Sequence, residues 1–366
     1  HQHLGRAPVE GAQPLYTRNL AQVIEYVPAD LTITVEAGVT LGQIQALLQP
    51  NRQWLPWDPP CGAPATIGGL LASGRVGPLR YGYGTPRDWV LGMRVALGDG
   101  RLVRSGARVV KNVAGYDMHK LHLGALGTLG VIAEATLKIA PLPEATATLL
   151  VHTSGLQAAL EAAEALRRPP HHPASLVILD PHGSAAPAWR VVVRYAGVQT
   201  AVTRLAGEAQ QRIAAVDGAA LADVSAIEAE QAAIWQPIVE FPTPAEQAIT
   251  LRIGVPASAL GMAFAALQRH AAPAACAGYP GIGLVYARWP LPAASNAAGV
   301  GAALTALREE LRAAGGYAVV EAAPESMRAL LDLWGPAPDT LAIMRSIKQR
   351  WDPHGILNHG RYAGNI

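Results

Sequence analysis

The feature that most constrains this chain is the concentration of glycine in one segment of it. Fifteen of the 37 glycines lie between Gly62 and Gly130. Side-chain packing does not require so many glycines, whereas a backbone that turns sharply or closely approaches another group does. The glycines cluster where expected helices and strands end, and free N–H groups at such ends can bind a phosphate or the oxygen atoms of a cofactor. This segment is therefore the candidate ligand-binding region.

The composition indicates an ordinary folded chain. Its 366 residues are 50% hydrophobic and 15% charged, which predicts about two domains with a large core. The formal net charge is only +2 and the charges are scattered, so nucleic acid is not an expected partner. Cys61 and Cys276 are too far apart in sequence to build an iron–sulfur cluster or a zinc site from this chain's own thiols. Prolines and glycines interrupt the longest uncharged run, 271–287, so no transmembrane segment is expected.

Local patterns in the first part of the chain predict an alternation of strands and short helices. Alternating apolar and polar residues indicate a strand over 31–37, and Thr40 with Gln43 forms a capping box for a helix that Pro50 ends. A hairpin is expected over 93–104 and a strand over 131–139. Asp117 is expected to cap a short helix. Prolines shortly after residue 139 then mark a domain boundary.

In the second part of the chain, Ala-rich segments typical of helices alternate with segments typical of strands. The expected elements are helices over 156–166, 200–215, 258–270 and 303–314 and strands over 190–195, 249–253 and 317–321. No glycine fingerprint of a doubly wound nucleotide-binding sheet follows these strands, so a layered α+β domain with an antiparallel sheet is predicted. A last helix over 340–351 leads into a tail of turn residues.

Five segments, taken as an ordered set, carry a resemblance to a known family. They are residues 66–69, 81–88, 111–117, 127–132 and 352–360. Together they resemble the FAD-linked oxidase family, whose flavin domain is of the vanillyl-alcohol-oxidase type. Segments at the start of the chain, at 111–117 and around Trp235 are most similar to the FAD-binding E subunits of bacterial glycolate oxidases.

The resemblance implies an α+β architecture. Residues 1–143 would form the PCMH-type FAD-binding domain, a mixed or antiparallel sheet with helices, without the first strand–turn–strand and diphosphate loop of the family. Residues 144–337 would form an α+β cap domain with an antiparallel sheet, and residues 338–366 a C-terminal helix and tail that return to the flavin. The tail carries His359 where the family usually has proline.

The resemblance also implies which residues bind a noncovalent FAD. The Thr-Ile-Gly-Gly loop and the Ala-x-x-Gly after it would follow the pyrophosphate and ribityl chain, and a Gly-x-x-Arg-Asp turn would lie behind them. The Gly-Thr-Leu-Gly-Val-Ile segment would pass the adenine and isoalloxazine edges, and the tail asparagine would approach the flavin. The residues with these roles are Thr66, Ile67, Gly68, Gly69, Ala72, Gly74, Gly84, Arg87, Asp88, Gly127, Thr128, Gly130, Val131, Ile132 and Asn358.

The residues that would take hydrogen from a substrate are less clear. The metal-binding strings of the related D-hydroxyacid dehydrogenases, G-H-x-x-D-G-N-x-H and G-E-H-G, do not occur in this sequence, so no metal site is expected. Lys111 and Tyr116 lie beside the flavin segments and are the catalytic candidates. The sequence is equally compatible with a solvated Lys111 and a packed Tyr116 that have no catalytic role. His119 and His122 are expected to be exposed or to cap a helix.

The function implied by the resemblance is that of a FAD-binding subunit in a glycolate (2-hydroxyacid) oxidase complex, which converts glycolate to glyoxylate. A catalytic flavin subunit and an iron–sulfur subunit would be the partners, in line with the scarcity of cysteine in this chain. Two alternatives stay open: a self-sufficient FAD-dependent oxidase of another alcohol or hydroxyacid, and a non-catalytic assembly subunit that has lost the flavin. A cytoplasmic location is expected, and attachment to the inner membrane through partners stays open.

Overall fold

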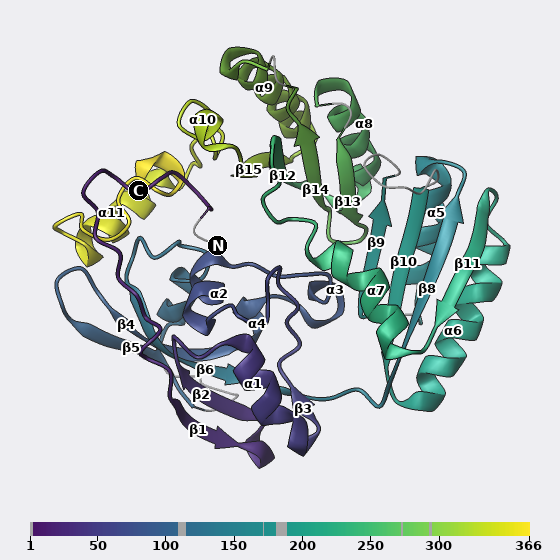
Figure 1. Cartoon of the computed structure of the whole chain (residues 1–366), viewed down its shortest axis with the longest axis horizontal. Coiled ribbons are helices and arrows are strands. Elements are labelled where there is room, and N and C mark those ends of the chain that lie inside the picture. Colours follow the sequence, from purple (N-terminus) through teal and green to yellow (C-terminus); the bar gives the residue numbers. More distant parts are fainter. Residues whose placement is uncertain (1–2, 109–114, 171, 181–188, 272–273, 293–294) are drawn as a thin grey trace. The chain divides into compact units, whose positions relative to one another are not determined.

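The chain divides into two compact units in the computed structural model (Figure 1), which describes residues 3–108, 115–170, 172–180, 189–271, 274–292 and 295–366. The segments of unit 1 are His1–Gly77, Gly84–Leu142 and Pro336–Ile366. Those of unit 2 are Pro78–Tyr83 and Pro143–Gly335. The last segment of the chain thus belongs to the same unit as the first.

Unit 1 is built on a five-stranded antiparallel sheet with the order β1-β2-β6-β4-β5. The strands are β1 (Val23–Val27), β2 (Thr32–Glu36), β4 (Val90–Ala96), β5 (Leu102–Gly106) and β6 (Val131–Lys138). A separate antiparallel pair consists of β3 (Gln53–Trp54) and β7 (Ala140–Pro141). The predicted strand over 31–37, the hairpin and the strand over 131–139 are confirmed as β2, β4–β5 and β6.

The described residues of unit 1 include the helices α1 (Leu41–Leu48), α2 (Ile67–Ser73), α4 (Pro86–Trp89) and α11 (Leu341–Trp351). The predicted capping box is present at the start of α1, because the Gln43 amide donates to Thr40 Oγ1 at 3.2 Å and the Thr40 amide donates to Gln43 Oε1 at 2.8 Å. Both exchanges satisfy amide groups that have no partner within the helix.

The predicted cap by Asp117 is wrong. Asp117 precedes a short 3-10 turn, Met118–Leu121, but its side chain accepts no capping hydrogen bond from that turn. Its carboxylate instead accepts from Lys120 Nζ at 2.6 Å. The Asp117 carboxylate, which the sequence predicts as a helix cap, therefore pairs with the ammonium group of Lys120.

Unit 2 contains an eight-stranded antiparallel sheet with the order β11-β8-β10-β9-β13-β14-β12-β15. Its strands are β8 (Ala145–Thr153), β9 (Ser175–Leu179), β10 (Trp189–Gly197), β11 (Ala219–Ser225), β12 (Ala248–Gly254), β13 (Ala275–Tyr279), β14 (Leu284–Pro290) and β15 (Tyr317–Ala322). The antiparallel sheet predicted for the second part of the chain is confirmed.

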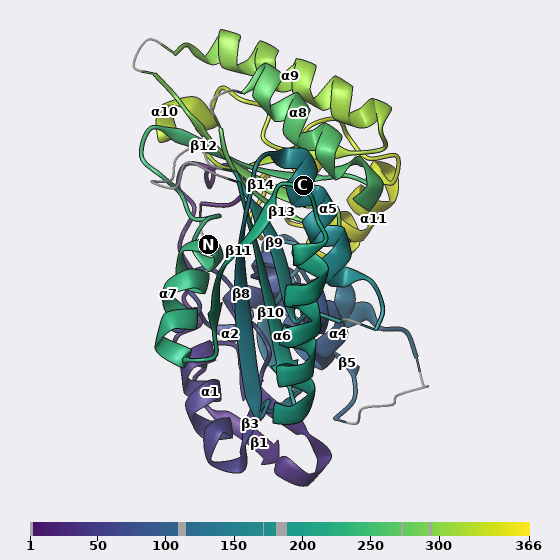
Figure 2. The same ribbon diagram turned by 90° about the vertical axis from the view of Figure 1, so that its right-hand side faces the viewer.

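Helices cover both faces of this sheet (Figure 2). One face packs against α5 (Leu156–Arg167), α6 (Gln199–Ala214), α8 (Leu260–His270) and α9 (Ala297–Ala313). The other face packs against α7 (Glu228–Val239), which buries Trp235 and Ile238. The described residues of unit 2 also form two four-residue helices, α3 (Arg80–Tyr83) and α10 (Glu325–Arg328). Within the described part of the chain, none of the helices has the length and apolarity needed to cross a bilayer.

Candidate cofactor site

Helix α2 begins the glycine-rich site in unit 1. Thr66 has an extended backbone and accepts a hydrogen bond from the Gly69 amide on its Oγ1 at 3.2 Å, which makes it the N-cap of α2. The helix ends at Gly74, whose φ of 65° lies in the left-handed region that glycine adopts without strain. The Thr-Ile-Gly-Gly segment, which the family resemblance describes as a loop, is therefore the start of a capped two-turn helix.

The first amide groups of α2 already have protein partners. The Ile67 amide donates to Val39 O and the Gly68 amide donates to Ala37 O, each at 2.8 Å. The Gly69 amide donates to the N-cap, as described above. We therefore assign these residues a role in the shape of the site rather than in supplying free hydrogen-bond donors.

The two glycines of the Gly-Gly pair face different surroundings. A Cβ added to Gly68 would lie 2.8 Å from the Cβ of Ala37, so this glycine permits close packing of α2 on the protein. A Cβ added to Gly69 would meet only Thr66 Oγ1, at 3.0 Å, and would otherwise enter open space. Gly69 therefore keeps a space open beside α2.

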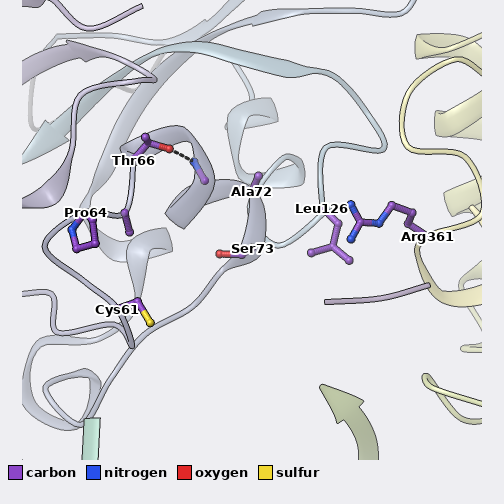
Figure 3. A pocket seen from close by; sticks show the side chains of 9 residues that line it. Cys61, Pro64, Thr66, Ala72, Ser73, Leu126 and Arg361 are labelled. Atoms are coloured by element: carbon purple, nitrogen blue, oxygen red, sulfur yellow. Dashed lines mark hydrogen bonds between the residues drawn. The ribbon is translucent and has the colours of Figure 1, made fainter. Parts of the chain in front are cut away.

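That space is a cavity of about 380 Å³ within unit 1 (Figure 3). Three predicted cofactor-binding residues, Thr66, Gly69 and Ala72, contribute to its wall. The sequence did not predict the remaining lining residues. They are Cys61, Pro64, Ala65, Ser73, Leu126 and Arg361.

The loop after residue 123 forms one side of the cavity and is fixed to the last turn of α2. The Gly124 amide donates to Leu71 O at 2.9 Å, and the Leu126 amide donates to Ala72 O at 2.8 Å. Leu126 has a φ of 53°, a conformation that is uncommon for a residue with a side chain and that often marks a functional site. These hydrogen bonds hold the Leu126 side chain at the cavity.

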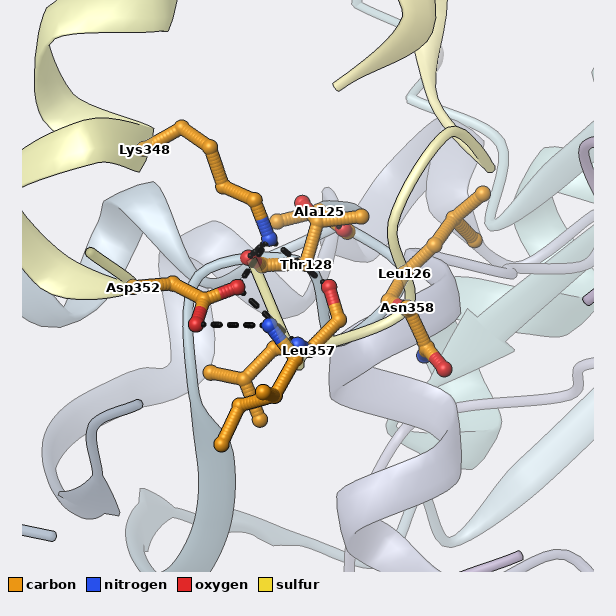
Figure 4. A network of polar contacts seen from close by, with 8 residues as sticks. Ala125, Leu126, Thr128, Lys348, Asp352, Leu357 and Asn358 are labelled. Atoms are coloured by element: carbon orange, nitrogen blue, oxygen red, sulfur yellow. Dashed lines mark hydrogen bonds and ion pairs between the residues drawn. The ribbon is translucent and has the colours of Figure 1, made fainter. Parts of the chain in front are cut away.

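A buried ion pair fixes the C-terminal tail to the same loop (Figure 4). Lys348 Nζ donates to Asp352 Oδ2 at 2.5 Å, to Thr128 O at 2.8 Å and to Leu357 O at 2.7 Å. Asp352 also accepts from the amides of Ile356 and Leu357, at 3.0 and 2.9 Å. Burial alone would raise the pKa of Asp352, but the hydrogen bonds from Lys348 and the two amides outweigh it and lower the pKa.

Asn358 adds a second contact between tail and loop. Its Nδ2 donates to Leu126 O at 2.6 Å, and its own φ is 42°. A Cβ on Gly127 would lie 2.9 Å from this amide nitrogen, so the glycine allows the close approach. Asn358, a predicted flavin contact, therefore reaches the loop that forms the cavity wall.

Arg361 joins the tail to the beginning of the chain. Its Nη2 donates to Leu4 O at 2.7 Å and its Nε donates to Arg6 O at 3.0 Å. The Arg6 amide donates back to Arg361 O at 3.2 Å. These contacts hold the guanidinium group at the cavity, where its residue is 8% exposed.

Two known protein families match this chain at the segments that build the cavity. The FAD binding domain matches residues 1–106, which include the lining residues of α2, and the C-terminal domain of FAD linked oxidases matches residues 334–362, which include Arg361. The chain thus contains segments that match two domains of FAD-linked oxidases. Its cofactor is FAD.

This chain matches its relatives of known function over less than half of their own length. The glycolate oxidase subunit GlcE of Escherichia coli (strain K12) is 43% identical over 162 residues, which are 44% of this chain and 46% of GlcE. The glycolate oxidase subunit GlcD of Bacillus subtilis (strain 168) is 36% identical over 177 residues, which are 48% of this chain and 37% of GlcD.

A solved structure supports the same fold over nearly the whole chain. Alkyldihydroxyacetonephosphate synthase superimposes with a TM-score of 0.69 over 93% of this chain and 67% of that chain, at 16% sequence identity. This likeness confirms the predicted PCMH-type α+β fold.

The residues of the cavity fit a bound FAD. Gly69 leaves open the volume that a side chain would fill, Thr66 and Ser73 bring hydroxyl groups, and Arg361 brings a positive charge. Hydroxyl groups and an arginine are groups that bind the phosphates of a diphosphate cofactor.

The other predicted cofactor residues do not line the cavity. Gly84 has a φ of 79°, Asp88 accepts from the Thr85 amide at 2.8 Å to start α4, and Arg87 is exposed. Gly130 packs against Val95, where a Cβ would have no room. The predicted residues that are not among the lining residues are Ile67, Gly68, Gly74, Gly84, Arg87, Asp88, Gly127, Thr128, Gly130, Val131, Ile132 and Asn358.

Of the two catalytic candidates, the structure describes only Tyr116. Lys111 lies outside the described residues. Tyr116 is 88% exposed and is not a lining residue, so the alternative of a packed tyrosine is wrong. In the part of the chain that the structure describes, no three His, Cys, Asp or Glu side chains form a group that could hold a metal ion.

His119 and His122 are buried, and the expectation that they are exposed or capping is wrong. They are 2% and 5% exposed. Ser105 Oγ lies 3.3 Å from His119 Nδ1, and the His122 ring stacks on Trp351 with centroids 5.1 Å apart. The sequence pattern missed this burial because the contacts come from a strand and a distant helix.

These histidines predict a loss of stability in acid. Burial, with the neighbouring His119 as a second cause, lowers the pKa of His122 from 6.5 to about 4. Burial also lowers the pKa of His119, and Asp117 opposes this effect. In acid these histidines bind protons in the unfolded chain more readily than in the folded chain. Their contribution to the free energy of unfolding is therefore fully present above pH 6.5 and is lost as the pH decreases toward about 4.

Urea unfolding of the protein at pH 7.5 and at pH 4.5 measures this loss. His122 alone is expected to lower the free energy of unfolding by about 3 kcal/mol between these two pH values. His122→Phe retains a ring on Trp351 and should flatten the pH dependence while leaving the stability at pH 7.5 nearly unchanged. An unchanged pH dependence in this variant would contradict the assignment.

Proposed function

We propose that this chain is the FAD-binding subunit of an oxidase complex that acts on a 2-hydroxyacid, with glycolate as the substrate and glyoxylate as the product. The observation that carries the proposal is that the wall of the cavity beside α2 combines residues from the segments that match both FAD families. When bound, FAD supplies the acceptor for the electrons of the substrate.

In this proposal, each part of unit 1 has a role in binding FAD without a covalent bond. Thr66, Gly69 and Ala72 form the wall that the cofactor contacts. Asn358 holds the Leu126 carbonyl, and through it the shape of the opposite wall. The buried pair of Lys348 and Asp352 keeps the tail in place, so that the cavity is preformed before the cofactor binds.

The proposal of a complex follows from the relatives, which are named as subunits of glycolate oxidase. We propose a catalytic flavin subunit and an iron–sulfur subunit as partners. This chain has two cysteines, Cys61 and Cys276, too few for the thiolate ligands of a common iron–sulfur cluster. Electrons that leave the flavin would therefore pass to clusters in another chain.

Glycolate oxidation by the purified chain and by the chain co-purified with its partners tests this proposal. The chain alone should contain FAD and oxidise glycolate slowly, and the complex should oxidise it many times faster. Fast oxidation by the chain alone would identify a self-sufficient oxidase. A complex that is active although this chain contains no FAD would identify a non-catalytic assembly subunit.

A further inference from the structure

We infer that Arg190 and His152 form a binding site for a small carboxylate anion in unit 2. The two residues lie on neighbouring antiparallel strands, where Arg190 of β10 pairs in register with His152 of β8. Residues directly opposite each other in such a pair have Cβ atoms about 4.5–5.5 Å apart. This site goes beyond the proposed function, which concerns the cavity in unit 1.

Both side chains lie on the face of the sheet that α7 covers. Side chains alternate between the two faces along a strand. Along β10, Val191 and Val193 pack in the core on the opposite face, and Val192 packs in the core under α7. Arg190 therefore lies on the α7 face, and so does His152, because paired residues share a face.

Helix α7 contacts this face at a different level of the two strands. Trp235 Nε1 donates to Thr148 Oγ1 at 2.9 Å, and the Arg194 guanidinium group lies over the Trp235 ring, 4.5 Å from its centroid. Thr148 and Arg194 are paired with each other, four residues along their strands from His152 and Arg190. His152 is exposed, so a ligand can reach the pair from solvent.

The charge of Arg190 has no acidic partner among the described residues. Its Nε is buried and has no hydrogen-bond partner there, and burial lowers the pKa of the guanidinium group. Asp180 accepts from Gln268 of α8 at 3.3 Å, on the opposite face of the sheet, and Asp223 of β11 pairs in register with Leu150. A charge that is partly removed from water and unpaired is unfavourable, so this position favours the binding of an anion.

A short carboxylate is the anion that fits these two groups. A guanidinium group matches a carboxylate with two parallel hydrogen bonds, and an imidazole N–H donates a third. Leu179, the register partner of Arg190 on its other side, contributes apolar surface for a short carbon chain. Because Arg190 is only partly exposed, a small molecule reaches its guanidinium group more readily than a carboxylate that is fixed to a partner protein. Glycolate and acetate are therefore suitable probes.

The test is a titration of the purified chain with glycolate, acetate and glycolamide, followed by nuclear magnetic resonance of the ligand. Glycolate and acetate should bind with a Kd of about 0.1–10 mM, the range expected for ligands of so few atoms, and the neutral glycolamide should not bind. Arg190→Gln should raise both Kd values by about 10-fold or more, and His152→Ala should raise them by a smaller factor.

Arg194→Gln is the matched control, because it changes the same residue type on the same strand and face, where the guanidinium group already lies over Trp235. This variant should bind glycolate and acetate as the wild type does. Arg190→Lys retains the charge and should keep more of the affinity than Arg190→Gln. Circular dichroism of each variant shows whether it is folded.

Absence of glycolate and acetate binding in the wild-type chain would overturn the inference, and so would unchanged binding in a folded Arg190→Gln variant. A glutamate capped at both ends represents a carboxylate of a partner protein. If it binds more tightly than glycolate, the pair serves a protein interface and the inference of a small ligand is overturned. The FAD content of the chain, measured separately, tests the proposed function.

Discussion

Gly69→Leu should abolish FAD binding while unit 1 remains folded. The new side chain would enter the cavity, because a Cβ at this position meets only Thr66 Oγ1. Gly69 lies within α2, where leucine is favoured over glycine by about 0.5–1 kcal/mol, so the fold should tolerate the change. The Kd for FAD should rise by roughly 100-fold or more, as measured by titration of the flavin-free protein, with circular dichroism as the measure of folding.

Gly68→Ala is the matched control, because it changes the neighbouring residue of the same helix. Its Cβ would lie 2.8 Å from the Cβ of Ala37, and such overpacking should lower the stability by about 1–3 kcal/mol. It should leave the FAD affinity of the folded protein close to that of the wild type. If Gly69→Leu folds and binds FAD as the wild type does, the cavity beside α2 is not the FAD site.

Lys348→Met should produce a larger loss of stability than single substitutions elsewhere in α11 and the tail. It would leave the Asp352 carboxylate buried without its cation and would remove the donor to Thr128 O and Leu357 O. Breaking a buried pair from one side costs about 3–5 kcal/mol. The loss should appear in urea unfolding of the protein, together with faster hydrogen exchange of the loop amides near Thr128.

Lys120→Met is the control for this substitution. Lys120 pairs with Asp117 at 2.6 Å, but the two side chains are 27% and 52% exposed. An exposed pair of this kind contributes about 1 kcal/mol or less. Similar losses of stability in the two variants would contradict the role given to the pair of Lys348 and Asp352.

The features that the sequence predicted well depend on local chemistry. The capping box of Thr40 and Gln43 lies within one helical turn, and the hairpin of β4 and β5 is closed by adjacent turn residues. The layered second unit follows from the alternation of Ala-rich helices with apolar strands. Each of these patterns is complete within a short stretch of chain, so no distant contact is needed to decide it.

The features that the sequence missed depend on distant contacts. Glycine has a low helix propensity, but Thr66 caps α2. A side chain at position 68 would collide with Ala37, so the packing of α2 requires glycine there. Arg361 binds carbonyl groups 355 and 357 positions earlier in the chain. His122 is buried by Trp351, which belongs to a helix at the other end of the sequence. The family resemblance predicted the cofactor-binding residues, and three of them, Thr66, Gly69 and Ala72, line the cavity.

The measurement that most directly tests the central claim is the visible absorption spectrum of the purified protein after incubation with FAD and removal of the excess. Flavin bands shifted from those of free FAD, at one FAD per chain in the wild type and absent in Gly69→Leu, are the predicted result. A wild-type protein that is folded and shows no flavin bands would contradict the assignment of this cavity as a FAD site.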